Sequence, residues 1–232
     1  MRIAGAGRTD AGVHAIGQVI SFRTASALDG SKLGRGVNAL LPEDVAISAL
    51  ETCGDEFHAR FSATGRTYEY RLRVGPDRDP LERWAYHHPA ALRLDALREA
   101  SAALVGLADF GSFANGESAE RQSERRPQRG MVRTVRRAEW TREGELLRFE
   151  IEADAFLRGM VRAIVGTLLW VGRGKIGIER FGQIVGSSDR AQAGPSAPAR
   201  GLCLTRVEYG QGDRRGERAS ESSEQHQERE GE

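Results

Sequence analysis

Between residues 67 and 209 two kinds of segment follow one another along the chain. In some, apolar side chains recur at every second position, and in others they recur at the spacing of a helix. Strict alternation is typical of a half-buried strand, and a period of about 3.6 residues is typical of an amphipathic helix. The pattern predicts strand, helix, strand, strand, helix and strand over residues 67–74, 95–105, 132–141, 146–153, 155–171 and 202–209. This β-α-β-β-α-β order is that of a ferredoxin-like unit, which RNA-binding RRM domains also use, so we expect an α+β fold.

Polar residues at the ends of these elements indicate where they begin and stop. Asp95 is a candidate N-cap for the first helix, with Gly106 as its stop, and Asp154 is a candidate N-cap for the second helix. Residues 142–145 are expected to form the turn between the two central strands. A further short helix is expected near residues 178–185, and it leaves the order of the unit unchanged.

The first 55 residues give a shorter version of the same order. The pattern predicts strand, strand, helix and strand over residues 1–6, 17–23, 31–41 and 44–52. An opening strand and helix are missing from this β-β-α-β string, so we expect two related halves, residues 1–55 and residues 56–210, of which the first is truncated.

Two stretches are too polar to belong to either half. Residues 211–232 contain no aliphatic or aromatic side chain except Ala219, so burial cannot offset their ordering entropy and a disordered tail is expected. Residues 116–130 are expected to form a long, arginine-rich loop. Such a loop either contacts RNA or is simply solvated.

The net charge of +1 conceals an uneven distribution. The tail has seven acidic and four basic side chains, so it carries −3 and the first 210 residues carry +4. Lys32 and Lys175 are the only lysines, and arginine is the side chain that pairs bidentately with phosphate and stacks on bases. The composition therefore favours a nucleic-acid partner weakly, and arginine-rich codon usage explains it at least as well.

Several classes of protein are excluded or disfavoured. No apolar run approaches the roughly 20 residues that cross a bilayer, and the N-terminus lacks the basic and apolar regions of a signal peptide. We therefore expect a cytoplasmic protein with no membrane partner. Cys53 and Cys203 are too few for a disulfide framework or a structural zinc site, and both are expected to be small buried residues.

The segment between the first two strands, residues 5–15, carries the strongest chemical signal. Its three glycines let the backbone turn sharply and approach a ligand closely, and Asp10 lies among small neighbours where its carboxylate can point into a cleft. Asp and Gly also dominate ordinary turns, so a plain turn is an alternative explanation. The glycine spacing is not a dinucleotide fingerprint and no Walker lysine follows, so no cofactor is expected.

This segment, GAGRTDAGVHA, closely resembles the signature of the tRNA pseudouridine synthase A family. Other segments agree with that family in order and spacing: residues 18–22, 57–63, 66–70, 156–162 and 201–204. The resemblance covers roughly residues 2–209. It implies a pseudouridine synthase fold and an isomerase that converts uridine to pseudouridine at positions 38 to 40 of the tRNA anticodon stem-loop. It implies no metal and no small-molecule cofactor.

Members of that family carry a strand and a helix before the G-R-T-D motif, which agrees with the elements that are missing here. We therefore expect Met1 to be an internal methionine, with the coding sequence continuing in frame upstream. A loop as long as residues 116–130 is also unusual for the family.

The resemblance assigns roles to individual residues. Asp10 is expected to be the nucleophile and Arg162 its basic partner, while Tyr68 stacks on the target uracil and Leu202 forms an apolar floor. Arg8, two residues before Asp10, is placed to contact a phosphate or to fill the vacated stack. From periodicity alone Tyr68 fits a core position, and Arg162 fits a helix arginine whose stem is buried and whose head reaches water.

The remaining expectations concern partners. A body charge of only +4 suggests that a homodimer supplies the broad basic surface that tRNA needs. His14 has no cluster of possible metal ligands around it in the sequence, so a structural role is expected. Two alternatives stay open, namely a ferredoxin-like RNA-binding module without activity and a pseudouridine synthase that acts on another RNA.

Overall fold

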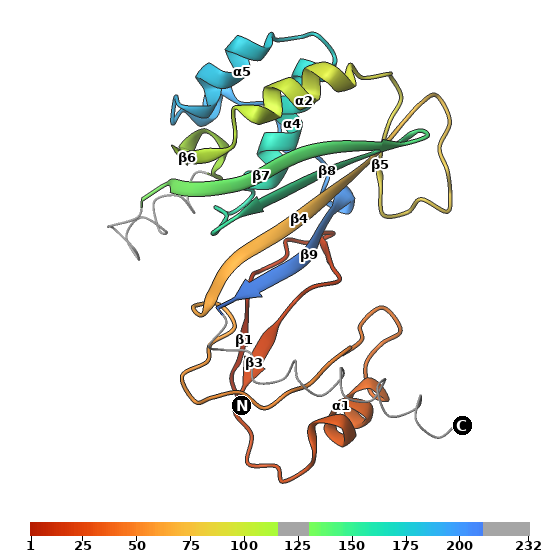
Figure 1. Cartoon of the computed structure of the whole chain (residues 1–232). Coiled ribbons are helices and arrows are strands. Elements are labelled where there is room, and N and C mark those ends of the chain that lie inside the picture. Colours follow the sequence, from red (N-terminus) through yellow and green to blue (C-terminus); the bar gives the residue numbers. More distant parts are fainter. Residues whose placement is uncertain (116–129, 211–232) are drawn as a thin grey trace, which may run out of the picture. The chain divides into compact units, whose positions relative to one another are not determined.

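The computed structural model describes residues 1–115 and 130–210 (Figure 1). The expected tail and all but the last residue of the expected basic loop lie outside these residues. The described chain divides into two compact units. Unit 1 contains residues 1–6, 19–63 and 209–210, and unit 2 contains residues 7–18 and 64–208.

Unit 2 is built on a mixed, mostly antiparallel sheet. Its strands are β2 (His14–Ala15), β4 (Ala63–Val74), β5 (Tyr86–His88), β6 (Gly106–Asp109), β7 (Val132–Glu143), β8 (Leu146–Ala153) and β9 (Leu202–Tyr209). They follow the order β2-β9-β4-β8-β7-β6, and β5 pairs with β4. The pairs β4/β8, β7/β8 and β6/β7 are antiparallel, whereas β2/β9 and β4/β5 are parallel. The expected α+β class is confirmed.

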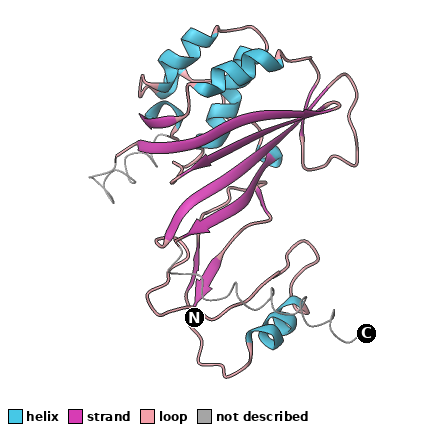
Figure 2. Ribbon diagram, viewed as in Figure 1, coloured by secondary structure: helices cyan, strands magenta, loops and turns pink. Residues whose placement is uncertain are grey.

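Helices cover one face of this sheet, namely α2 (Leu94–Ala102), α4 (Met160–Gly172) and α5 (Ile178–Val185) (Figure 2). Side chains alternate between the two faces of β4, and the helices pack on the apolar face, where Tyr70 and Leu72 are fully buried. Across the strands Tyr70 faces Phe149, and Phe149 faces Trp140, whose indole donates to Ser101 on α2 at 3.0 Å. Three short 3-10 helices, Gly111–Phe113, Arg190–Gln192 and Ala199–Gly201, lie in the connections.

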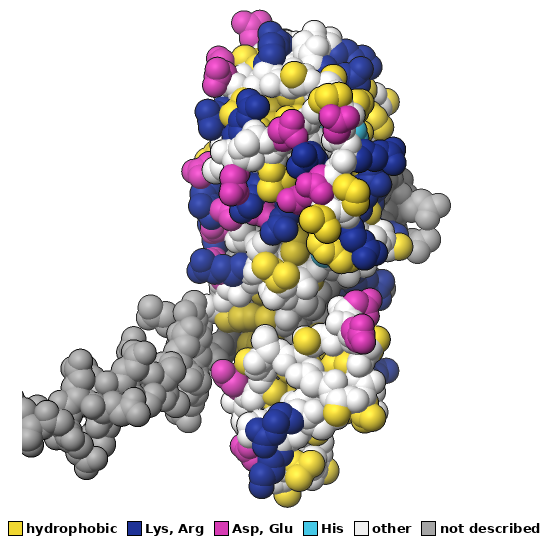
Figure 3. Space-filling model, turned by 90° about the vertical axis from the view of Figure 1, so that its right-hand side faces the viewer, with side chains coloured by type: hydrophobic (Ala, Val, Ile, Leu, Met, Phe, Trp, Pro, Cys, Tyr) yellow, Lys and Arg dark blue, Asp and Glu magenta, His cyan; other side chains and the backbone are white. Residues whose placement is uncertain are grey.

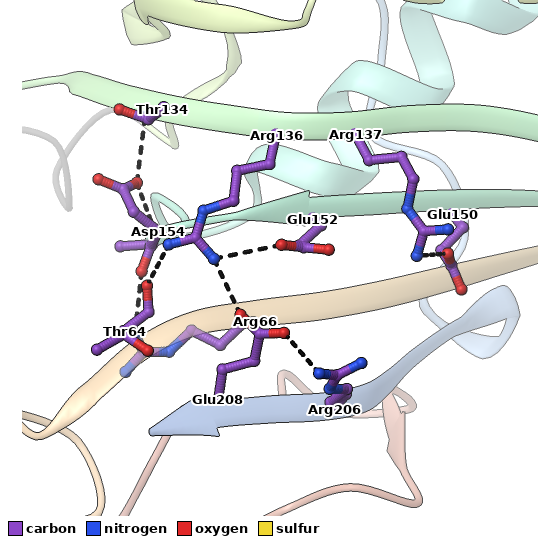
Figure 4. Close-up of polar contacts among 11 residues, drawn as sticks. Thr64, Arg66, Thr134, Arg136, Arg137, Glu150, Glu152, Asp154, Arg206 and Glu208 are labelled. Carbon is purple, nitrogen blue, oxygen red and sulfur yellow. Dashed lines mark hydrogen bonds and ion pairs between the residues drawn. The ribbon is translucent and has the colours of Figure 1, made fainter. Parts of the chain in front are cut away.

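The opposite side chains of the same strands are charged and paired with one another. A bulge between Val135 and Arg137 in β7 lets two consecutive arginines reach neighbouring acids (Figure 4). Arg136 contacts Glu208 at 2.9 Å and Glu152 at 3.2 Å, and Arg137 pairs with Glu150. In the view of Figure 3, basic and acidic side chains are interspersed over the surface.

Unit 1 holds a small hairpin and one helix. Strands β1 (Ile3–Gly5) and β3 (Ile20–Phe22) pair antiparallel, and α1 (Gly30–Asn38) is capped by Asp29, which accepts from the Ser31 N–H at 3.1 Å. The strand predicted over residues 44–52 is wrong. The Asn38 side chain instead donates to the Ile47 carbonyl at 2.8 Å and accepts from its N–H at 2.7 Å, so an amide occupies the place of a neighbouring strand.

Most of the predicted elements of unit 2 are confirmed, but three boundaries were wrong. Helix α4 begins at Met160 and not at residue 155, because Asp154 accepts from the N–H groups of Thr134 and Ala155 at 3.1 and 2.6 Å and so ends β8. Asp95 lies inside the first turn of α2 and makes no cap bond. Gly106 opens β6 with a φ of 119°.

The structure also bears on the expectations about the two cysteines and about membrane spans. Cys53 is exposed and Cys203 is half-buried, so the prediction that both cysteines are buried was wrong. In the part of the chain that the structure describes, no helix is both long enough and apolar enough to cross a membrane.

Candidate active site

The glycine-rich segment of unit 2 forms a turn that presents Asp10. The Asp10 carbonyl accepts from the Val13 N–H at 2.9 Å, and Gly12 has a φ of 79°, the positive value that a type II turn needs at its third residue. The chain then enters β2, where His14 lies opposite Cys203 of β9. This pairing ties the turn to the sheet and leaves the Asp10 side chain 32% exposed.

Two arginines flank the Asp10 carboxylate, one at each oxygen. Arg158 Nε lies 3.7 Å from Oδ1, and Arg162 Nη1 lies 3.7 Å from Oδ2. Both distances exceed those of direct hydrogen bonds, which are about 2.7–3.2 Å, so the lone pairs of the carboxylate stay available. The sequence predicted Arg162 and missed Arg158. The only signal was the spacing of four residues between the two arginines in the segment Phe156–Arg162.

Arg162 is fixed on α4 by the segment of residues 193–198, which we call the strap. Arg162 Nε donates to the Ala197 carbonyl at 2.7 Å, and the Ala197 N–H donates back to the Arg162 carbonyl at 2.9 Å. The Gly194 N–H also donates to Thr167 Oγ1 at 2.8 Å, one turn further along the helix. With its side chain only 22% exposed, Arg162 is held against both the strap and Asp10 and does not extend into solvent.

Arg158 lies on the short segment between β8 and α4, which exists because the helix starts late. Gly159, the residue before α4, has a φ of 74°, and a Cβ there would lie 2.9 Å from Asn115 Cγ. Only glycine meets both conditions easily. This turn sets the Arg158 side chain at the surface, 66% exposed.

Tyr68 stands on β4 beside the carboxylate. Its ring meets Phe156 edge to face, with 5.1 Å between the centroids. Burial raises the pKa of the Tyr68 phenol, the positive charge of Arg66 opposes this, and the negative charge of Asp10 adds to it. The phenol is therefore neutral at neutral pH, and Tyr68 both packs against the core and borders the site.

The other expected residues lie around this centre. Leu202, at the start of β9, is 6% exposed and belongs to the hydrophobic core. Arg8 is exposed, and its side chain has no hydrogen-bond or ion-pair partner among the described residues. The His14 ring meets Trp84 edge to face at 4.2 Å. Within residues 1–115 and 130–210, no group of three or more His, Cys, Asp or Glu side chains could hold a metal ion.

This arrangement combines a partly exposed carboxylate, two guanidinium groups and an aromatic ring, which suits chemistry on a planar, anionic substrate such as a nucleotide. A family profile described as tRNA pseudouridine synthase matches residues 1–62 and 100–210. The chain therefore belongs to the tRNA pseudouridine synthase family, whose members are isomerases, and the resemblance seen in the glycine-rich segment is confirmed.

Individual relatives agree with the profile. A protein of Geobacillus kaustophilus is 41% identical over 210 residues, which are 90% of this chain and 78% of the relative. One of Chloroflexus aurantiacus is 43% identical over 216 residues, covering 90% and 74%, and one of Geobacter sulfurreducens is 41% identical over 210 residues, covering 90% and 83%. All three carry the name tRNA pseudouridine synthase A.

Proposed function

We propose that this protein converts uridine to pseudouridine at positions 38 to 40 of the tRNA anticodon stem-loop, with Asp10 as the catalytic carboxylate. The observation that carries the proposal is the position of Asp10, 3.7 Å from each of two arginines, in the segment that carries the family signature. The names of the relatives support tRNA as the substrate.

The reaction moves the ribose from one atom of uracil to another. The bond between N1 and C1′ breaks, the base turns within the pocket, and a bond forms between C5 and C1′. The hydrogen of C5 leaves as a proton and N1 gains one, so the isomerisation is balanced without an oxidant or a second substrate. Asp10 acts either by attack on the nucleotide or by removal of a sugar proton, and Arg162 stabilises its charged form in both routes.

The target base must leave the stem before it can reach Asp10. Unstacking and unpairing cost a few kcal/mol, and stacking on an aromatic side chain returns about 1–3 kcal/mol per base. Tyr68 is the ring beside Asp10 that can provide this stacking, with Leu202 as the apolar floor. Arg8, exposed two residues before Asp10, contacts a phosphate or fills the space that the base leaves.

We also propose that residues 1–55 and 56–210 belong to two ferredoxin-like halves. The neighbouring order β9-β4-β8-β7, with α2 and α4 on one face, supports this for the second half. The pairing of β2 with β9 explains why the compact units divide the chain differently, since it draws residues 7–18 towards the second half.

A homodimer in the cytoplasm completes the proposal. Many arginines of the open sheet face are paired with glutamates, which leaves one chain a modest basic surface for a molecule as large as tRNA. Two copies would double that surface.

The test uses unmodified tRNA transcripts that carry tritium at C5 of uridine. Pseudouridine formation exchanges this tritium into water, and mapping of the modified sites then shows which uridines reacted. We expect release that stops after the uridines at positions 38 to 40 have reacted. Binding without release would support an RNA-binding module, and release from a different RNA alone would indicate another substrate.

A further inference from the structure

The two arginines beside Asp10 differ in how far they are exposed to solvent. Arg162 is 22% exposed and its Nε is committed to the Ala197 carbonyl at 2.7 Å. Arg158 is 66% exposed, and it reaches Oδ1 of Asp10 with Nε at 3.7 Å. One guanidinium is therefore largely buried within the site, whereas the other is exposed to solvent beside the same carboxylate.

A nucleotide that enters this site brings its own negative charge. Each phosphate of the RNA backbone carries one charge, and the carboxylate of Asp10 repels it at short range. An exposed cation next to the carboxylate is the group placed to neutralise such a phosphate. Arginine suits this exchange because its planar fork binds carboxylate and phosphate with the same geometry.

We propose that Arg158 is a substrate-binding residue that pairs with Asp10 in the free enzyme and moves to a backbone phosphate of the bound RNA. This inference rests on the proposed function, and it adds a second contact residue that the family signature does not assign. It also distinguishes the two oxygens of the carboxylate. Arg162 stays beside Oδ2, whereas the departure of Arg158 leaves Oδ1 without a neighbouring guanidinium.

The proposal predicts that Arg158→Gln weakens the binding of tRNA and leaves the turnover number nearly unchanged. The KM for tRNA should rise about tenfold, as expected for the loss of one charge-assisted hydrogen bond. The slope of log binding constant against log salt concentration should fall by roughly 0.7–0.9, the value for one phosphate contact. The kcat should stay within about twofold of wild type, because Arg158 has already left Asp10 in the complex. Arg158→Lys should restore most of the slope.

Two control variants separate this role from others. Arg180→Gln removes an exposed arginine on α5 that bonds to Gln183 at 3.1 Å, so it should change neither KM nor slope. Arg162→Gln should lower kcat at least 100-fold without changing the slope. If Arg158→Gln behaves like Arg162→Gln, Arg158 stays on the carboxylate during the reaction and the proposal is overturned.

A second measurement avoids turnover altogether. In the Asp10→Asn background, tRNA binding is measured at equilibrium over a range of salt concentrations. The change of Arg158 to Gln should still lower the salt slope by the value for one phosphate contact. An unchanged salt slope in both backgrounds would also overturn the proposal. Tritium release by the wild-type protein is measured first, so that a missing activity counts against the proposed function and an unchanged slope counts against Arg158 alone.

Discussion

Gly166→Ala should weaken both the protein and its active site, because this glycine lies where the strap crosses α4. A Cβ at Gly166 would overlap the Pro195 carbonyl oxygen and lie 2.9 Å from the carbonyl carbon and 3.2 Å from the Ala197 nitrogen. The atoms in the way belong to backbone, so no side chain can turn aside to make room. The strap must move away from the helix.

The size of the effect follows from the bonds that the strap makes. The shift stretches the two hydrogen bonds between Ala197 and Arg162 and the bond from Gly194 to Thr167. Hydrogen bonds contribute about 0.5–1.5 kcal/mol each, and roughly 1.5–3 kcal/mol when one partner is charged. Overpacking of a core costs about 1–3 kcal/mol by itself. Since the strap relaxes partly, we expect the free energy of unfolding to fall by about 2–4 kcal/mol.

Urea unfolding at 25 °C measures this loss, and tritium release at a temperature where the variant is folded measures kcat. We expect kcat to fall at least tenfold, because Arg162 loses the anchor that directs it at Asp10. Gly182→Ala in α5 is the matched control, since a Cβ there meets nothing within 4 Å. That variant should gain roughly 0.5–1 kcal/mol from helix propensity. A Gly166→Ala protein with wild-type stability and wild-type kcat would refute the reasoning.

Three further variants test the site. Asp10→Asn should abolish tritium release while leaving urea unfolding and tRNA binding nearly intact, and retention of even about a tenth of the wild-type kcat would exclude Asp10 as the nucleophile. Arg162→Lys should lower kcat more than about tenfold despite its conserved charge, because an ammonium group cannot bond to Ala197 and face Asp10 at once; an unchanged kcat would make Arg162 a structural residue only. Burial raises the pKa of Tyr68 in the folded protein, so its contribution to stability is present below the unfolded value of about 10 and is lost as the pH rises further. The decline of the urea midpoint above that pH should therefore be shallower in Tyr68→Phe, and an equal decline would contradict a raised pKa.

The long elements of unit 2 could be predicted because a single pattern continues through each of them. From Leu147 to Ala153, strand β8 alternates between buried and half-buried side chains, and α5 has the predicted bounds. Two shorter strands of this unit, β2 and β5, escaped prediction. The two residues of β2 and the three of β5 are too few to show a period, and each is held by a parallel partner far away in the sequence.

The start of α4 shows a different limit. Residues 155–157 continue the helical spacing, so periodicity alone places them in the helix. Two competing constraints decide otherwise: Asp154 bonds to β7 through Thr134, and Gly159 adopts a left-handed conformation against Asn115. Both depend on contacts that sequence spacing does not encode. The error matters for the description of the site, because the late start leaves Arg158 exposed beside Asp10.

The site residues also differ in whether the sequence could predict them. Asp10, Tyr68 and Arg162 could be predicted because a long, specific motif carries them, and the structure brings these three together. Arg158 lies in the same segment as Arg162, but the resemblance assigned it no role, and its place beside Asp10 follows from the turn at Gly159. The two kinds of residue also differ in their surroundings. Backbone hydrogen bonds hold the Asp10 turn and the Arg162 side chain, the latter through the strap. Arg158 lies on an exposed turn, and the partner exchange that we propose for it would therefore disturb little core packing.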